Sequence, residues 1–202
     1  ALHYFVAGRY DLAWRHSRHA GERAAARYAP AAAAEAYARA AEAARLSPEG
    51  GADERSLDLE SLGDALFLAG RSAEAADAYR EALRTARGDP LREAHLALKL
   101  GRVEQRRGRY AVALRRLSLG LRALSGTDGA QVSAARARLQ ARYAVCRVSQ
   151  GRYPDARRWA QRAVGEATAA GERDALAQAH LVLHTVELWS ADPLVRLHAT
   201  DQ

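Results

Sequence analysis

The sequence predicts an all-α fold, a right-handed α-solenoid of about ten helices arranged as antiparallel pairs. In residues 59–82, apolar and small residues recur at the i, i+3, i+4 and i+7 spacing of one helix face, on both sides of Gly70. The glycine between two such stripes returns at Gly108 and Gly151, at intervals of 38 and 43 residues. Helix pairs that recur in this way are typical of stacked repeats, because each pair buries its apolar face only against its neighbours.

The most complete helix pair lies between residues 56 and 87. Gly63 and Ala75 are small where two helices must cross closely, and Tyr79 fills the space beside them. Gly70 suits a helix end, and Ser72 is expected to cap the next helix, because its hydroxyl can accept from the free N–H groups of the first turn. The residues that carry the pattern are Leu62, Gly63, Leu66, Gly70, Ala75, Tyr79 and Ala82. This series resembles the tetratricopeptide repeat, which implies a solenoid fold and a protein-binding role.

The remaining segments follow in chain order and are expected to form one domain over residues 1–202. Residues 1–46 predict atypical N-terminal helices, in which one helix from about Asp11 to Arg27 packs both on residues 1–8 and on residues 31–46. Residues 47–54 are rich in Ser, Pro and Gly, which favours a connector. Further repeats are expected at 94–125 and 137–168, and an incomplete terminal repeat at 174–200.

The composition limits the classes of partner and location. The 202 residues carry a formal net charge of +7. Basic residues are interleaved with acidic ones along the predicted helices, which favours a solvated surface and makes a nucleic-acid partner unlikely. No segment reaches the ~20 apolar residues of a membrane span, and the first residues lack the features of a signal peptide. Cys146 is the only cysteine, which predicts a cytoplasmic location and no intrachain disulfide.

Candidate catalytic and metal-binding residues are few. His180 and His184 are four residues apart, and His16 and His19 are three apart, so each pair can share one helix face. Because neither pair has a third ligand or an HExxH motif, we interpret these histidines as surface or packing residues. Cys146 lacks a neighbouring His–Asp set and is interpreted as a buried thiol. These observations predict a protein that is not an enzyme and has no metal or cofactor.

A concave groove lined by the first helix of each repeat is the expected site for a protein or peptide partner. Counting from the start of each repeat gives the expected groove residues: Glu60, Asp64, Phe67, His95, Arg102, Gln105, Arg106 and Arg138, followed by Val145 and Ser149. An acidic segment of the groove therefore lies beside a basic one. The Lys/Asn set with which some tetratricopeptide repeats bind a C-terminal carboxylate is absent, which argues against that ligand.

A second resemblance covers the two ends of the chain. The segments LHYFVAGRYDLAWRHSRHAGERAAARYAPAAAAEAYARA (residues 2–40) and AQAHLVLHTVELWSADP (residues 177–193) carry it. They resemble the helical sensor region that follows the ATPase module in bacterial ATPase-linked adenylate/guanylate cyclases and large ATP-dependent transcription regulators. The resemblance implies a chain cut from, or diverged from, a multidomain signalling protein. It implies no catalytic residue within these 202 residues.

Three functions remain open on this evidence. The first is a protein-interaction or sensor scaffold within a larger bacterial signalling ATPase or regulator. The second is a stand-alone adaptor that self-associates through its repeats, and the third is a basic nucleic-acid-binding solenoid. Apolar residues such as Phe5 and Leu188 lie near ends that lack polar capping helices. We therefore expect the isolated chain to associate end to end, or its ends to be covered by flanking domains.

Overall fold

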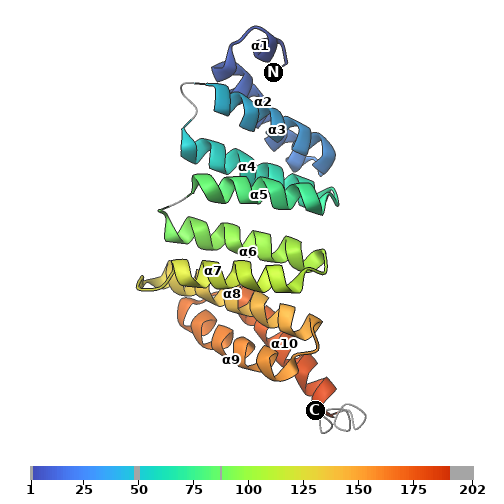
Figure 1. Ribbon diagram of the computed structural model, residues 1–202, viewed down its shortest axis with the longest axis vertical. Helices are drawn as coiled ribbons and strands as arrows, with labels where there is room; N and C mark the ends of the chain where they lie inside the picture. Colours follow the sequence, from blue (N-terminus) through green and yellow to red (C-terminus); the bar gives the residue numbers. More distant parts are fainter. Residues whose placement is uncertain (1, 48–50, 87, 192–202) are drawn as a thin grey trace.

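The structure is a computed structural model that describes residues 2–47, 51–86 and 88–191, apart from the side chains of residues 190 and 191. These residues form ten α-helices and no strand. In chain order they are α1 (Leu2–Val6), α2 (Tyr10–Ala26), α3 (Pro30–Leu46), α4 (Ala52–Leu68), α5 (Ser72–Thr85), α6 (Pro90–Arg106), α7 (Tyr110–Ala123), α8 (Ala130–Ser149), α9 (Tyr153–Ala170) and α10 (Arg173–Ala191). They stack in chain order along the long axis of the molecule (Figure 1). The predicted all-α solenoid is confirmed.

Consecutive helices form antiparallel pairs: α2 with α3, α4 with α5, α6 with α7, and α8 with α9 (Figure 1). The last three pairs turn at Gly70, Gly108 and Gly151, whose φ angles are 79°, 72° and 71°. Glycine suits these turns because it has no Cβ and adopts positive φ without strain. Helix α1 packs on α2, and α10 packs on α8 and α9, so the two flanking helices lie at opposite ends of the stack.

The helices of a pair cross closely at a small residue on the first helix. A Cβ built at Gly63 would lie 2.5 Å from Cε1 of Tyr79, and one built at Gly101 would lie 2.6 Å from Cδ2 of Leu117. Carbon atoms in ordinary contact are ~3.5–4.0 Å apart, so this packing has no room for a larger residue at either position. Ala144 takes the equivalent place on α8 and is fully buried. The close crossing predicted at Gly63 is confirmed, and the same packing recurs at Gly101.

Residues 10–46 form a regular pair, which differs from the atypical helices expected for residues 1–46. Gly21 of α2 packs against Tyr37 of α3, and a Cβ at Gly21 would lie 2.8 Å from the ring. These two residues have the same separation in sequence as Gly63 and Tyr79. Helix α2 does contact both α1 and α3, as expected. The regular repeat geometry of this pair was not evident from the sequence, because Tyr28, with a φ of 55°, replaces the turn glycine.

Helix starts depend on the preceding turn. Helix α5 begins at Ser72 itself, with Arg71 as its N-cap residue and no side-chain cap. The expectation that Ser72 caps this helix is therefore wrong: the carbonyl of Arg71 accepts from the backbone N–H of Ala75 at 3.0 Å, so Ser72 is already the first helical residue. In α6 the carboxylate of Asp89 accepts a 3.1 Å hydrogen bond from the backbone N–H of Arg92. The partner helix expected at 194–200 lies outside the described residues.

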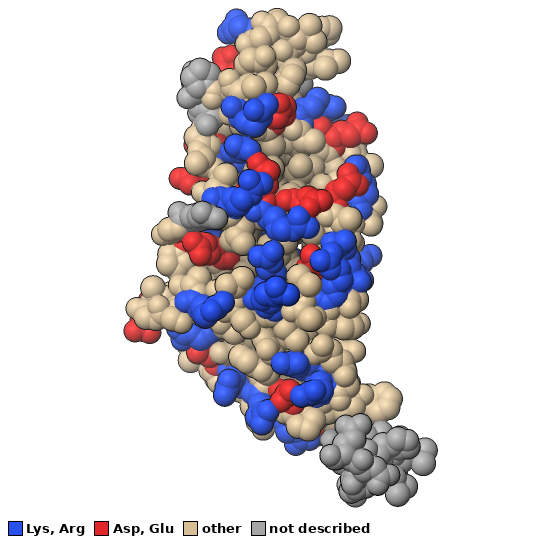
Figure 2. All heavy atoms as spheres, viewed as in Figure 1, with Lys and Arg blue, Asp and Glu red and all other residues tan. Residues whose placement is uncertain are grey.

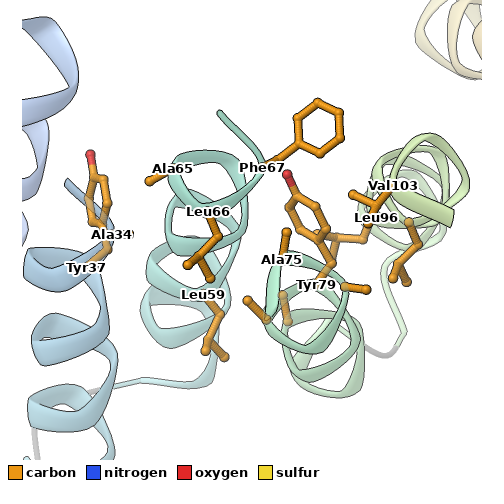
Figure 3. Close-up of a cluster of buried hydrophobic side chains, with 14 of the residues drawn as sticks. Ala34, Tyr37, Leu59, Ala65, Leu66, Phe67, Ala75, Tyr79, Leu96 and Val103 are labelled. Carbon is orange, nitrogen blue, oxygen red and sulfur yellow. The ribbon is translucent and has the colours of Figure 1, made fainter. Parts of the chain in front are cut away.

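The core runs between neighbouring pairs. Its largest cluster joins α3, α4, α5 and α6, and Figure 3 shows Leu66 and Tyr79 within it. Cys146 is fully buried, and burial raises the pKa of its thiol to about 11. Within residues 2–47, 51–86 and 88–191, no cluster of His, Cys, Asp and Glu is arranged to hold a metal ion. A search of the same residues finds no helix that is both long and apolar enough to span a membrane.

Candidate functional site

The first helices of successive pairs, α2, α4, α6 and α8, are connected by polar side chains. We call the surface that they share the first-helix face. All ten residues of the expected groove lie on α4, α6 or α8. The structure brings some of them into contact with one another: Glu60 with His95, and Phe67 with Arg102 and Arg106. Gln105 instead contacts Arg142, and Arg138 shares a pocket with His95.

Glu60 is the centre of the ionic contacts between α4 and α6. Its carboxylate accepts from Nζ of Lys99 at 2.6 Å, lies 2.8 Å from Nε2 of His95, and pairs with Arg92. Burial by itself raises the pKa of Glu60, but the hydrogen bonds to His95 and Lys99 outweigh it and lower the pKa to about 2. Glu60 is therefore ionised at neutral pH and fully engaged within the chain.

Asp64 extends this network by one helical turn. Its carboxylate accepts from Nζ of Lys99 at 2.5 Å and from the hydroxyl of Tyr79 at 2.6 Å. Burial and the adjacent charge of Asp64 raise the pKa of Tyr79, so its hydroxyl stays protonated and donates. The acidic segment expected in the groove is present, and cations of α6 neutralise it.

Phe67 carries two guanidinium groups from α6. The Cζ atoms of Arg102 and Arg106 lie 5.0 and 4.9 Å from the centre of its ring. Figure 3 shows this ring at the edge of the core, beside the hydroxyl of Tyr79. The ring itself is buried, both arginines are exposed, and neither makes an ion pair with a described residue. Stacking on an aromatic face holds both charges in place without neutralising them.

A pocket of about 280 Å³ lies between α6 and α8. Its apolar wall includes Leu91, Leu98 and Ala134, and His95 and Arg138 supply polar groups. Arg138 also pairs with Glu172, at 2.5 Å. Beyond the pocket, Nη1 of Arg142 donates to Oε1 of Gln105 at 3.3 Å. The interface of α6 and α8 thus offers an apolar recess beside basic side chains.

Several residues of this face were not found from the sequence. Asp58 is buried on α4 and accepts from Nε1 of Trp14 at 2.6 Å and from Nε of Arg18 at 2.7 Å. Lys99 and Arg142 were also missed as members of the face. A pattern was available for these two, because each directly precedes the large–small residue pair at a helix crossing, Leu100–Gly101 or Tyr143–Ala144.

A second basic region lies between the second helices α5 and α7. A cleft of about 730 Å³ is lined by Arg80, Arg84, Arg116 and Arg122 together with apolar residues such as Leu119. Arg80 and Arg84 are paired within α5 with Asp77 and Glu81. On the face that Figure 2 shows, acidic side chains lie among the basic ones.

The fold resembles that of known structures. The crystal structure of MamA protein matches with a TM-score of 0.58 at 13% sequence identity, over 90% of this chain and 96% of that one. BtubC (BKLC) from P. vanneervenii matches with a TM-score of 0.58 at 15% identity, over 96% of this chain and 91% of that one. At these identities the matches support the helical-repeat fold. No protein-family model and no curated protein sequence matches the chain.

Proposed function

We propose that the chain is a protein-interaction scaffold that binds an acidic protein segment on the first-helix face, over α6 and α8. The observation that carries this proposal is the pair of exposed guanidiniums of Arg102 and Arg106, fixed on Phe67 and without a counter-ion among the described residues. Arginine side chains that are already stacked on a ring lose little conformational entropy when a partner binds. Their guanidinium groups also match the geometry of a carboxylate. Glu60 and Asp64 position the cations of α6 and do not contact the partner in this proposal.

The proposed setting is a larger bacterial signalling ATPase or regulator. The resemblance of residues 2–40 and 177–193 to the sensor region of such proteins supports it. The alternative setting is a stand-alone adaptor that self-associates through its ends. The full-length gene separates the two settings: an ATPase module encoded in the same reading frame supports the first, and a gene of this length alone supports the second.

The binding proposal is tested with a fluorescein-labelled 12-residue peptide of alternating glutamate and leucine. We expect the chain to bind it with an affinity that falls as salt is raised, because exposed charge pairs are screened. The double variant Arg102→Glu, Arg106→Glu should abolish binding while the melting temperature changes little. The matched control Arg115→Glu, Arg122→Glu makes the same charge change on α7 and should bind as the wild type does. Equal binding by the first double variant contradicts the proposal.

A nucleic-acid-binding solenoid is the second candidate, and the arginine-lined cleft between α5 and α7 favours it. If nucleic acid binds there, its affinity should fall steeply with salt, because each neutralised phosphate releases counterions. Arg116→Glu combined with Arg122→Glu should then remove binding of a labelled 20-residue single-stranded DNA. We expect no such binding near physiological salt, since Arg80 and Arg84 are already paired with acidic residues.

A further inference from the structure

Two successive contacts between first helices use the same positions with different residues. Lys99 of α6 and Arg142 of α8 both lie two residues before the small residue of a helix crossing, Gly101 or Ala144. Each therefore extends back toward the preceding first helix. Lys99 meets two carboxylates there, Glu60 at 2.6 Å and Asp64 at 2.5 Å.

Arg142 meets no carboxylate at the equivalent place. The residues of α6 that correspond to Glu60 and Asp64, each 38 positions later, are Leu98 and Arg102. The first offers no charge, and the second repels Arg142. Gln105 supplies a neutral acceptor, 3.3 Å from Nη1 of Arg142.

The guanidinium of Arg142 thus lacks part of the hydrogen bonds and ion pairs that it can form. Its Nε–H is buried and has no hydrogen-bond acceptor, and no described residue forms an ion pair with it. Burial, together with the charge of Arg102, lowers the pKa of Arg142. A partly buried arginine that lacks a counter-ion is unfavourable unless an anion reaches it. The α4–α6 contact shows which anion the same geometry accepts, a side-chain carboxylate.

We propose that Arg142, together with Arg102 and Gln105, is a binding site for the carboxylate of an acidic side chain in a partner protein. This site rests on the proposed function and specifies its ligand. The carboxylate would accept from Nη2 of Arg142, which is not among the buried atoms of this partly buried side chain, and from Arg102, while the amide of Gln105 donates to it from the side. Hydrogen bonds between a guanidinium and a carboxylate are charge-assisted and therefore strong.

The pocket between α6 and α8 indicates that the ligand also carries an apolar side chain. Leu98 lines this pocket and lies one helical turn before Arg102, and Arg138 lines it one turn before Arg142. Four residues of α-helix advance about 6 Å, and two residues of extended chain advance about 6.6 Å. An extended segment with an apolar side chain two residues from a glutamate or aspartate therefore places one in the pocket and the other on Arg142.

The carboxylate is assigned to a side chain because a binding feature flanks the site in each direction. The pocket at Leu91 and Leu98 lies on one side, and the exposed guanidinium of Arg106 lies on the other. A chain that continues past Arg142 in both directions uses both features, whereas a chain that ends there uses one. The ligand class is thus an internal acidic segment.

Peptides test the assignment directly. The probe is a fluorescein-labelled, C-terminally amidated eight-residue peptide of serine and glycine that contains one leucine and one glutamate two residues apart. We expect changing its glutamate to glutamine to weaken binding about tenfold or more, and moving the leucine next to the glutamate to weaken it as well. Equal binding by the glutamine peptide overturns the carboxylate assignment. Tighter binding of a peptide whose only acid is its C-terminal carboxylate overturns the assignment to a side chain.

Variants of the chain test the residue. Arg142→Gln should weaken binding of the glutamate peptide about tenfold and leave the weak binding of the glutamine peptide unchanged. The control Arg115→Gln, on α7, should leave both affinities unchanged. If Arg102→Glu with Arg106→Glu abolishes peptide binding but Arg142→Gln does not, this inference fails and the proposed function stands.

A double-mutant cycle tests Arg142 without any ligand. Leu98→Glu restores the carboxylate that Glu60 supplies in the preceding contact, and Leu98→Gln is its uncharged match. We expect the glutamate variant to melt at a higher temperature than the glutamine variant, and this difference to disappear in an Arg142→Gln background. If the difference persists or is absent from the start, Arg142 is not a carboxylate site. If the cycle succeeds and no acidic peptide binds, Arg142 pairs with a carboxylate only within the chain, and both the partner site and the proposed function fail.

Discussion

Glycine-to-alanine changes at two helical positions isolate the energy of a helix crossing. Gly101 of α6 and Gly165 of α9 both lie within helices, and alanine is favoured over glycine there by roughly 1 kcal/mol. A Cβ at Gly165 meets no atom within 4 Å. A Cβ at Gly101 would lie 2.6 Å from Cδ2 and 2.8 Å from Cγ of Leu117, which is fully buried. Both changes therefore gain the same helix propensity, but only Gly101→Ala adds a steric clash at a helix crossing.

The magnitude follows from the displacement that alanine requires. Carbon atoms in ordinary contact are ~3.5–4.0 Å apart, so Leu117 must move by about 1 Å within a packed core. Overpacking of this kind costs about 1–3 kcal/mol. Gly165→Ala should thus raise the free energy of unfolding by about 1 kcal/mol. Gly101→Ala should lower it by up to about 2 kcal/mol, and Gly101→Leu should lower it further.

The measurement is thermal and urea unfolding, followed by circular dichroism at 222 nm, for the wild type and the three variants. The difference between the two alanine variants gives the crossing energy, since the helix-propensity term cancels. Gly101→Ala combined with Leu117→Ala should destabilise the fold by less than the sum of the two single changes, because the smaller side chain leaves room for the new Cβ. Equal stability of Gly101→Ala and Gly165→Ala would show that α6 and α7 do not cross at Gly101.

Three other changes test the ionic contacts, the turns and the ends. Glu60→Gln should destabilise the fold by about 3 kcal/mol at pH 7. Because the pKa of Glu60 in the folded chain, about 2, lies below its usual value, this carboxylate stabilises the fold above about pH 4.5 and ceases to do so as pH falls toward 2. The urea midpoint of the variant should therefore change less than that of the wild type over this pH range. Tyr28→Gly should stabilise the fold by about 1 kcal/mol, since a φ of 55° strains tyrosine and the residue is 94% exposed. Gly70→Ala should lower the melting temperature, because a φ of 79° strains alanine in the same way. Light scattering over a dilution series should show end-to-end association that Val6→Ser weakens; a monomer at every concentration, with terminal helices as protected from hydrogen exchange as α6 and α7, contradicts this prediction.

The sequence by itself determined the helices, their pairing and their crossings. The period of apolar residues marks which face of a helix is buried, and a glycine with positive φ marks where a pair turns. Both are local properties, so the pairs around Gly70 and Gly108 were predicted with the small residues at their crossings in place. The contact of residues 11–27 with residues 31–46 was also predicted, but their regular repeat geometry was missed, because Tyr28 adopts the backbone conformation of those turn glycines.

Only the tertiary structure decided which charges are satisfied. Helical spacing placed Glu60 and Arg102 on the same face, but the sequence does not show that one is buried among cations of α6 and the other lies on Phe67. These contacts join residues about 35 positions apart, and their lengths depend on how neighbouring pairs stack. The unsatisfied Nε–H of Arg142 arises in the same way. Local pattern fixes the direction of a side chain, whereas the charge that it meets is set by the packing of another helix.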